Sequence, residues 1–255
     1  MTDAPFATKL LGWKSGKKGL LPNTADTSNK PSIAIAAAVL DNLGVPRGIA
    51  SGIVDPKSGR PLEVAVASDL AAEIPKLSPG RIWMIPKSAK PITNFVQYEH
   101  LKRVDLLVNS YEELKAALGT DYIIKPDVVV GLHSGENGDL PFLHAAVSCK
   151  WTIRSDRVQN IRHENNQMIR HRRDRLPHLA VVTAEPLPSR LASIARGTGE
   201  VDAVYHIAYD ALDQAISSLA KSGEITNDQL SDWHEVKVHS RVRPYSDLAD
   251  TLARW

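Results

Sequence analysis

The sequence predicts a mixed α/β or α+β fold, in which a mixed β-sheet is flanked by helices. Apolar residues at helical spacing dominate up to residue 118, and from residue 122 onward runs rich in Val and Ile alternate with amphipathic segments. The 255 residues could form one large domain or two small ones, but no repeat, low-complexity tract or linker divides them. We therefore expect one domain that spans residues 1–255.

The N-terminal part is predicted to be an arm followed by helices. Residues 14–31 are polar and turn-forming, so residues 1–31 are expected to form an arm or loop of the same domain. The apolar run that begins at Ser32 and stops at Gly44 predicts a buried helix.

A second helix is predicted after Pro61, because apolar residues then recur every four positions and a proline is favoured in the first turn. The recurring residues are Leu62, Val66, Leu70 and Ile74. Residues 93–118 are predicted to form one or two further helices.

Strands are expected from Tyr122 to Leu132 and from His144 to Ile153. Pro126 interrupts the first of them, which indicates a bulge or a sheet edge there. A helix is predicted from about Ser155 to Arg173, with Ser155 as its N-cap.

Shorter elements are predicted in the remaining sequence. Strands are expected at Leu179 to Thr183 and at Val201 to Ile207, and an amphipathic helix at Ala208 to Ala220. Residues 225–255 carry no decisive pattern.

The composition, with 43% hydrophobic and 24% charged residues, is that of an ordinary globular protein. The longest apolar run, Ile33 to Leu40, is far shorter than a membrane span, and no signal-peptide core precedes it. The single cysteine, Cys149, excludes an internal disulfide and a cysteine-based metal cluster within one chain. We expect a cytoplasmic protein without a membrane partner.

The net charge of +2 says little about partners, but the distribution of charge says more. Seven arginines and only three acidic residues lie between Arg154 and Arg175, and no lysine is among them. The planar guanidinium suits guanine edges and phosphates better than an ammonium does. A solvated basic helix face explains the charge alone equally well.

A candidate catalytic pair lies on the two predicted strands. Asp127 follows Pro126 on the first strand, and Lys150 shares one face of the second with Ser148, while Cys149 points to the other face. If the strands are neighbours, Asp127 and Lys150 can converge. A carboxylate that holds a divalent cation, with a lysine that orients or deprotonates water, can hydrolyse a phosphodiester. An ordinary ion pair is the alternative.

The following helix offers a further carboxylate, Glu164. It lies at the edge of the inward stripe that is formed by Val158, Ile161, Asn165 and Met168. A carboxylate that points inward needs a partner, and both Lys150 and a hard cation such as Mg²⁺ qualify. A solvated glutamate is the alternative.

A cysteine hydrolase that uses Cys149 with His144 or His163 is a rival hypothesis. Cys149 lies on the strand face opposite Lys150, so a core cysteine is favoured over a nucleophile. The nine histidines show no zinc-binding spacing, and no glycine-rich phosphate loop is present.

The motif residues also carry a family resemblance. The order of these residues resembles the form of the PD-(D/E)XK motif in which the second acid has moved to the following helix. The matching residues are Pro126-Asp127, then Ser148-Cys149-Lys150, and then, after thirteen residues, Glu164. The stretches HAAVSCKWTIRSDRVQN (144–160), RLPHLAVVTAEPLPSR (175–190) and GTGEVDAVYH (197–206) extend it. From about residue 119 to 210, and more weakly over 20–75, the chain resembles the NgoMIV-like type II restriction endonucleases.

This resemblance implies an α/β restriction-endonuclease-like core and a role for each matching residue. Asp127 and Glu164 would be metal ligands, together with the backbone carbonyl of Cys149. Lys150 would contact the attacking water, Ser148 would support the site, and Glu63 would be an additional active-site acid. The alternative for Glu63 is an acid that favours the positive end of its helix.

The resemblance also implies which side chains read the DNA bases. Arg154, Asp156 and Arg157 begin the predicted helix, and such residues can recognise guanine and cytosine edges in CCGG. Capping and surface ion pairs are the alternative. Asp26, Ser28 and Arg190 match readers of the outer base pairs, which implies the site GCCGGC.

The function implied is a Mg²⁺-dependent enzyme of the prokaryotic cytoplasm, with two ions per active site, that cuts double-stranded DNA. Cleavage after the first G would leave 5′-CCGG overhangs and 5′-phosphates. The resemblance implies a homotetramer built as a dimer of dimers, with a dimer as the fallback, and a palindrome calls for such symmetry.

Two other functions remain open. A repair or recombination nuclease could share this core, although the run from Arg154 to Arg157 favours sequence readout. A non-catalytic DNA-binding protein is the other, and the intact set Asp127, Lys150 and Glu164 argues against it.

Overall fold

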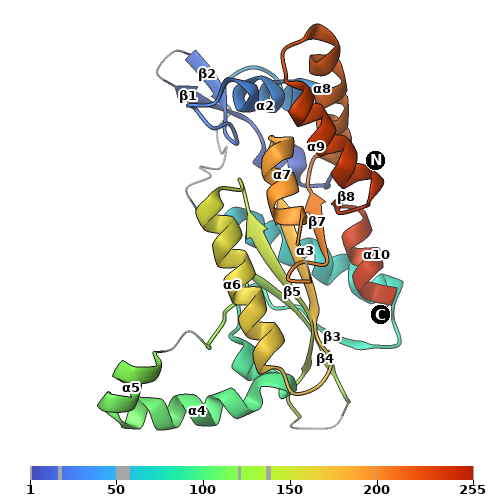
Figure 1. Ribbon diagram of the computed structural model, residues 1–255. Helices are drawn as coiled ribbons and strands as arrows, with labels where there is room; N and C mark the ends of the chain where they lie inside the picture. The colour runs from blue at the N-terminus through green and yellow to red at the C-terminus, as the bar shows by residue number, and fades with distance from the viewer. Residues whose placement is uncertain are drawn as a thin grey trace.

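A six-stranded mixed sheet forms the centre of the molecule, with α6 in front of it and α3 behind it (Figure 1). The computed structural model describes residues 2–16, 19–49, 58–119, 122–135, 139–197 and 199–254. In spatial order the strands are β3 (Ile82–Met84), β4 (Val128–His133), β5 (Phe142–Lys150), β6 (His178–Thr183), β7 (Ala203–His206) and β8 (Val242–Pro244). This architecture confirms the predicted α/β class with helices around a mixed sheet.

The sheet changes direction at β5. Strands β3, β4 and β5 are antiparallel neighbours, whereas β5, β6, β7 and β8 run parallel. Parallel neighbours need crossover connections. Helix α6 (Ser155–His171) connects β5 to β6, α7 (Pro188–Ala195) connects β6 to β7, and α8 (Tyr209–Ser222) with α9 (Asn227–Val238) connects β7 to β8. Helix α10 (Asp247–Arg254) follows β8.

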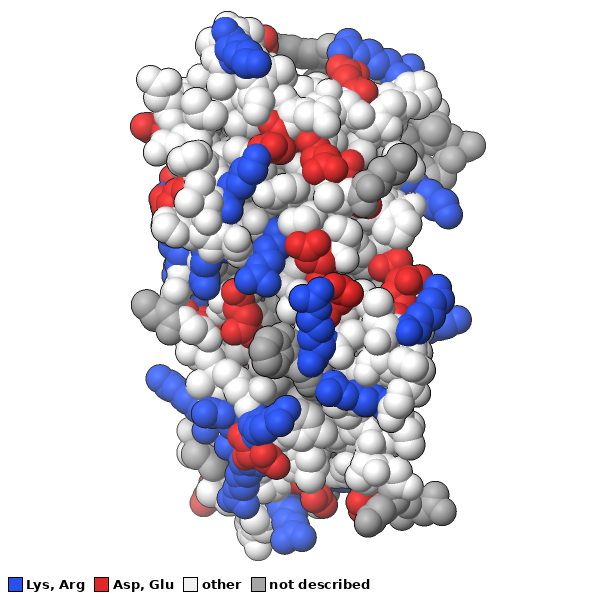
Figure 2. Space-filling model, turned by 90° about the vertical axis from the view of Figure 1, so that its right-hand side faces the viewer, with Lys and Arg blue, Asp and Glu red and all other residues white. Residues whose placement is uncertain are grey.

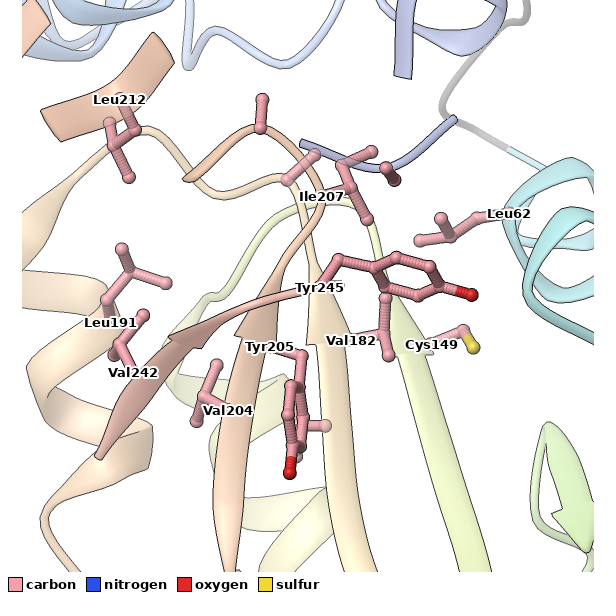
Figure 3. Close-up of a cluster of buried hydrophobic side chains, with 14 of the residues drawn as sticks. Leu62, Cys149, Val182, Leu191, Val204, Tyr205, Ile207, Leu212, Val242 and Tyr245 are labelled. Carbon is pink, nitrogen blue, oxygen red and sulfur yellow. The ribbon is translucent and has the colours of Figure 1, made fainter. Parts of the chain in front are cut away.

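Both faces of the sheet are covered by apolar side chains. Along β4, Val128 and Val130 pack into the larger hydrophobic cluster, while Val129 packs into a second one with Met168 of α6. Because strand side chains alternate, this division shows that each face has its own core. Figure 3 shows part of the larger cluster around the ends of β7 and β8.

The helices that precede the sheet agree with the predicted apolar spacing. Helix α2 (Lys30–Asn42) begins after Asn29, whose side chain accepts a hydrogen bond of 2.9 Å from the Ser32 amide. Helix α3 (Arg60–Leu77) has Pro61 in its first turn, and the four residues of the predicted stripe are buried. Short 3-10 turns (η1, Ile92–Asn94; η2, Val96–Tyr98) lead into α4 (Glu99–Ser110) and α5 (Glu112–Leu118), which extend away from the sheet (Figure 1).

The N-terminal segment has more structure than an arm or loop. It forms α1 (Ala7–Leu10) and a two-stranded antiparallel sheet of β1 (Trp13–Gly16) and β2 (Gly19–Pro22). Leu10 and Trp13 are buried in the main core, and their burial holds the otherwise polar segment in place.

The observed elements depart from the predictions in several places. Ser155 is the first residue of α6 and not its N-cap; Arg154 occupies the cap position in extended conformation, without a side-chain cap bond. Pro126 precedes β4 and does not interrupt it, and the irregularity lies instead between Val130 and Gly131. Strand β3 and the elements after residue 225 were not predicted, because short runs such as Ile82–Met84 lack a clear period.

The surface charge is mixed, in keeping with the small net charge. On the face in Figure 2, acidic and basic side chains are interspersed, and neither sign forms a continuous field. Within the part of the chain that the structure describes, no helix is long and apolar enough to span a membrane.

Candidate functional site

Asp127 and Lys150 meet where β4 and β5 separate. The antiparallel ladder ends at the Val128–Val147 pair, so Asp127 lies just before β4 and faces the last residues of β5. The Lys150 Nζ donates to Asp127 Oδ2 at 2.7 Å, and the Cys149 amide donates to the same oxygen at 2.8 Å. Each of the two charged side chains is 21% exposed, so solvent reaches the pair. The predicted convergence is confirmed.

Glu164 and Glu63 belong to the same electrostatic environment. Partial burial raises the pKa of Glu164, the negative charge of Asp127 raises it further, and Lys150 opposes this shift. The pKa of Glu63 is raised by burial and by Asp127 and lowered by Lys150. Three carboxylates, from α3, from the residue before β4 and from α6, therefore interact electrostatically with one ammonium group. Their mutual repulsion leaves negative charge to be balanced.

The donor set suits a hard cation, because carboxylate oxygens are its main protein ligands. Among the described residues, no group of three or more His, Cys, Asp or Glu side chains is placed to hold a metal ion. Mg²⁺ typically binds one or two carboxylates and keeps several waters, so an open set of this kind fits it.

Trp151 and Gly59 help to place Glu63 at the site, and neither role was predicted from the sequence. The Trp151 Nε1 donates to the Ser58 carbonyl at 3.0 Å, which ties the residue after Lys150 to the start of α3. A Cβ at Gly59 would lie 2.8 Å from Glu63 Oε1, so the Glu63 side chain folds back over this glycine. In the sequence, the glycine before Arg60 and Pro61 could have indicated that a side chain of α3 folds back over the start of the helix.

Ser148 and Cys149 are both buried on β5. The Cys149 side chain lies near Leu62, Val182 and Tyr245 (Figure 3). Burial raises the pKa of its thiol well above the usual range. This confirms a core cysteine and removes the basis for a thiolate nucleophile.

The three predicted readers of the inner bases lie at the start of α6. Arg154 and Asp156 are exposed, whereas Arg157 is partly buried. The Arg157 guanidinium donates to the carbonyl and the hydroxyl of Thr152, at 2.7 and 2.9 Å.

The three predicted readers of the outer bases also converge, although they are far apart in sequence. Arg190 Nη2 of α7 lies 2.5 Å from Asp26 Oδ2, and this ion pair holds the pKa of Asp26 well below its usual range. The Ser28 amide and hydroxyl both donate to Asp26 Oδ1, at 3.1 and 2.7 Å. The N-terminal segment and α7 thus build one polar cluster.

Two open cavities connect the inner and outer groups. One, of about 320 Å³, is lined by Asp26, Arg154, Arg157 and Arg190, among others. The other, of about 550 Å³, is lined by Arg154, Asp156 and Arg190, among others. Larger cavities elsewhere are lined by none of the predicted catalytic or base-reading residues. Because Arg154 and Arg190 line both cavities, the inner and outer groups belong to one surface.

One buried carboxylate beside this surface was not predicted from the sequence. Glu185, in the turn between β6 and α7, is 0% exposed and accepts hydrogen bonds from the amides of Ile153 and Leu187. Burial raises its pKa to about 7. The sequence feature that could have indicated Glu185 is its place as the first acidic residue after the apolar run of β6.

A mixed sheet with an aspartate and a lysine at the ends of neighbouring strands, and two more carboxylates around them, defines a restriction-endonuclease-like protein. The comparisons with known proteins identify the family. The chain belongs to the NgoMIV restriction enzyme family, whose sequence model matches residues 13–134 and 132–253. It is 36% identical over 283 aligned residues to the type II restriction enzyme NgoMIV of Neisseria gonorrhoeae, covering 97% of this chain and 96% of that protein.

The protein is therefore a type II restriction endonuclease, a site-specific deoxyribonuclease that binds DNA. Enzymes of this type generally need a divalent metal ion. The two matched stretches meet at residues 132–134, where β4 ends.

Proposed function

We propose that this enzyme cleaves double-stranded DNA at the palindrome GCCGGC, after the first G, and leaves 5′-CCGG overhangs. One observation carries the proposal. Only three residues separate Lys150 from Arg154 in the sequence. Lys150 belongs to the candidate catalytic centre, and Arg154 lines the cavities that it shares with Arg190. Chemistry and base recognition would thus occur at one end of the same strand, which suits cleavage within the recognised sequence.

The metal ion is proposed to be Mg²⁺, with two ions in each active site. Asp127, Glu164 and the Cys149 carbonyl oxygen would hold it, and Glu63 would supply a further carboxylate. The Cys149 amide donates to Asp127, and in a strand the carbonyl of the same residue points to the same edge. When bound, Mg²⁺ supplies an acidified water and polarises the phosphate.

The protein groups around this centre have separate tasks. The Lys150 ammonium, which Asp127 holds in place, would orient the attacking water and balance the charge that develops on the phosphate. Ser148 shares the strand face of Lys150 and would support its position. The raised pKa of Glu164 fits a carboxylate that gains from a nearby cation.

Base recognition is assigned to the two groups of side chains that share the cavities. Arg154, Asp156 and Arg157 would read the inner CCGG, because Arg can donate to guanine O6 and N7 while Asp accepts from cytosine N4. Arg190 and Asp26, positioned with Ser28, would read the outer G·C pair in the same way. Their ion pair supports this assignment, since it holds a guanine-type donor beside a cytosine-type acceptor.

A single domain of residues 1–255 would carry all these functions, with its N-terminal segment contributing to recognition. A homotetramer that is a dimer of dimers is the proposed assembly, with a dimer as the fallback. The described residues of each chain form one candidate active site, so cutting both strands of a palindrome symmetrically calls for at least two chains.

End mapping tests the proposed function. DNA of known sequence is incubated with the enzyme, with and without Mg²⁺, and the ends produced are sequenced. Cleavage only with Mg²⁺, at GCCGGC and after the first G, is expected. Mg²⁺-dependent ends at DNA branches or mismatches without a shared sequence would support a repair nuclease instead, and specific binding without cleavage would support a non-catalytic protein.

A further inference from the structure

The Glu185 carboxylate is the most enclosed acidic group next to the proposed recognition surface. Its side chain is fully buried; Oε2 accepts from the Ile153 amide at 2.7 Å, and Oε1 accepts from the Leu187 amide at 2.9 Å. Burial of a carboxylate is costly even when it is hydrogen-bonded, and an apolar residue at such a position often stabilises a fold at least as well. A role beyond stability therefore has to be considered for Glu185.

The backbone of Glu185 is held as firmly as its side chain. Its amide donates to Thr183 Oγ1 at 3.1 Å, and its carbonyl accepts from His206 Nε2 at 3.1 Å. The other ring nitrogen of His206 accepts from the Ala208 amide at 3.1 Å, so the ring is neutral with its proton on Nε2. Burial lowers the pKa of His206 to about 4, which keeps this arrangement at neutral pH. The carboxylate thus has a fixed position.

From this position Glu185 contacts both parts of the recognition surface. The Ile153 amide that it accepts from belongs to the residue directly before Arg154. Arg190 Nη1 lies 3.8 Å from Glu185 Oε2, while Arg190 Nη2 is bound by Asp26. One buried carboxylate therefore joins the backbone that carries an inner reader to the guanidinium that is assigned to the outer pair.

The two acids around Arg190 differ in what they can do when DNA binds. Asp26 is partly exposed and lines the open cavity, so it can turn to a base edge. Glu185 is enclosed and lines neither cavity, so it stays behind Arg190 as a fixed counter-charge. A guanidinium that releases Asp26 to engage guanine would still be oriented by Glu185.

We propose that Glu185 is a positioning residue for base recognition, which fixes the Arg190 guanidinium and thereby sets the discrimination at the outer base pair without touching DNA. This inference rests on the proposed function, in which Arg190 reads that pair. A role in stability alone would weaken binding to every duplex alike.

The test is Glu185→Gln, which keeps the size of the side chain, removes its charge and replaces one acceptor by an NH₂ group. Binding with Ca²⁺ in place of Mg²⁺ is measured for GCCGGC and for a duplex with exchanged outer pairs. The ratio of the two affinities is expected to fall about tenfold, the order of one lost bidentate contact. The double variant Glu185→Gln, Arg190→Ala should have the same ratio as Arg190→Ala alone, because Glu185 acts through Arg190.

A pH series separates positioning from a structural role. Between about pH 8 and about pH 6 the Glu185 carboxyl, with its pKa of about 7, takes up a proton and loses its attraction for Arg190. The charged groups that face it are Arg190 and Asp26; the pKa of Asp26 is far below this range, and that of His206, on its carbonyl, is about 4. The wild-type ratio should therefore fall with pH, whereas that of Glu185→Gln should stay constant.

Asp232→Asn is the matched control, because Asp232 of α9 pairs with Arg196 at the other end of α7. Its affinity ratio is expected to equal that of the wild type.

If Glu185→Gln fails to fold, Glu185→Asp is measured instead: a fall of about tenfold supports the inference and an unchanged ratio overturns it. If the wild type distinguishes the outer pairs and Glu185→Gln distinguishes them equally well, this inference is overturned and the role of Arg190 is not. A wild type that does not distinguish the outer pairs overturns the role of Arg190 as well.

Discussion

The Lys150 ammonium and the Asp127 carboxylate lie 2.7 Å apart, at the point where β4 and β5 separate. The same Asp127 oxygen accepts from the Cys149 amide, so the pair is fixed by backbone as well as by charge. Glu63 and Glu164 respond electrostatically to both members. Removal of either charge would therefore alter the whole centre.

Lys150→Ala is expected to reduce cleavage by about 10²-fold to 10⁴-fold, the range associated with a group that transfers or orients a proton. Specific binding in Ca²⁺ should persist, because no proposed base reader is removed. Single-turnover cleavage and gel-shift binding measure the two properties. Lys237→Ala, which breaks the exposed ion pair with Asp213, is the control and should cut normally. Wild-type cleavage by Lys150→Ala would contradict the assigned role.

Glu164→Gln should lower the affinity for the metal ion, because an amide is a weaker ligand than a carboxylate. The Mg²⁺ concentration required for half-maximal cleavage should rise, and high Mg²⁺ should restore part of the rate. A Mg²⁺ titration of cleavage checks this. Glu235→Gln, an exposed acid of α9 that pairs with Arg196, is the control. An unchanged Mg²⁺ requirement in Glu164→Gln would remove Glu164 as a ligand.

Base readout separates Arg190 from Arg154 and Arg157. Arg190→Ala should relax the outer pair and leave the inner CCGG requirement intact, whereas Ala at Arg154 or Arg157 should cost about 1–3 kcal/mol of inner discrimination per contact. Binding to GCCGGC, to sites with exchanged pairs and to random duplex, at two salt concentrations, gives the answer. An equal loss on all duplexes, with a salt slope lower by about one, would mean that these arginines contact only phosphates.

Acid should destabilise the fold through its buried histidines. Burial lowers the pKa of His206 and His144 to about 4, so the unfolded chain binds more protons than the folded chain between about pH 6.5 and pH 4. The stability that each neutral ring contributes is present above pH 6.5 and is lost as the pH falls, by about 3 kcal/mol in total for each histidine. The raised pKa of Glu185 acts in the opposite direction, so a histidine variant is needed to isolate the effect.

Urea unfolding at several pH values, with His206→Gln beside the wild type, makes this measurement. The variant should lose less stability than the wild type between pH 6.5 and 4, because Gln has no charge to gain. Identical pH slopes for the two proteins would show that His206 is not the titrating group.

The arrangement of the candidate catalytic centre could be predicted from the sequence better than that of the proposed recognition surface. Alternation along Ser148, Cys149 and Lys150 needs only local geometry, and the buried stripe of α6 follows from spacing alone, so the convergence on Lys150 could be expected. The contact between Asp26 and Arg190 joins residues 164 positions apart, and only the family resemblance indicated a shared role. Glu185 was missed because its importance comes from tertiary burial. The strands β1 and β2 were missed because a polar segment is held by the few apolar residues around Trp13.

The central claim is that Arg154 and Arg157, which follow the strand β5 that carries Lys150, direct cleavage to CCGG. Its most direct test compares the Mg²⁺-dependent single-turnover cleavage rates of two duplexes. They differ only in the four inner pairs, where each C·G pair is replaced by G·C and each G·C pair by C·G. The intact GCCGGC duplex should be cut after the first G at least about 10³-fold faster, because each wrong pair costs about 1–3 kcal/mol. Equal rates on the two duplexes would contradict the account.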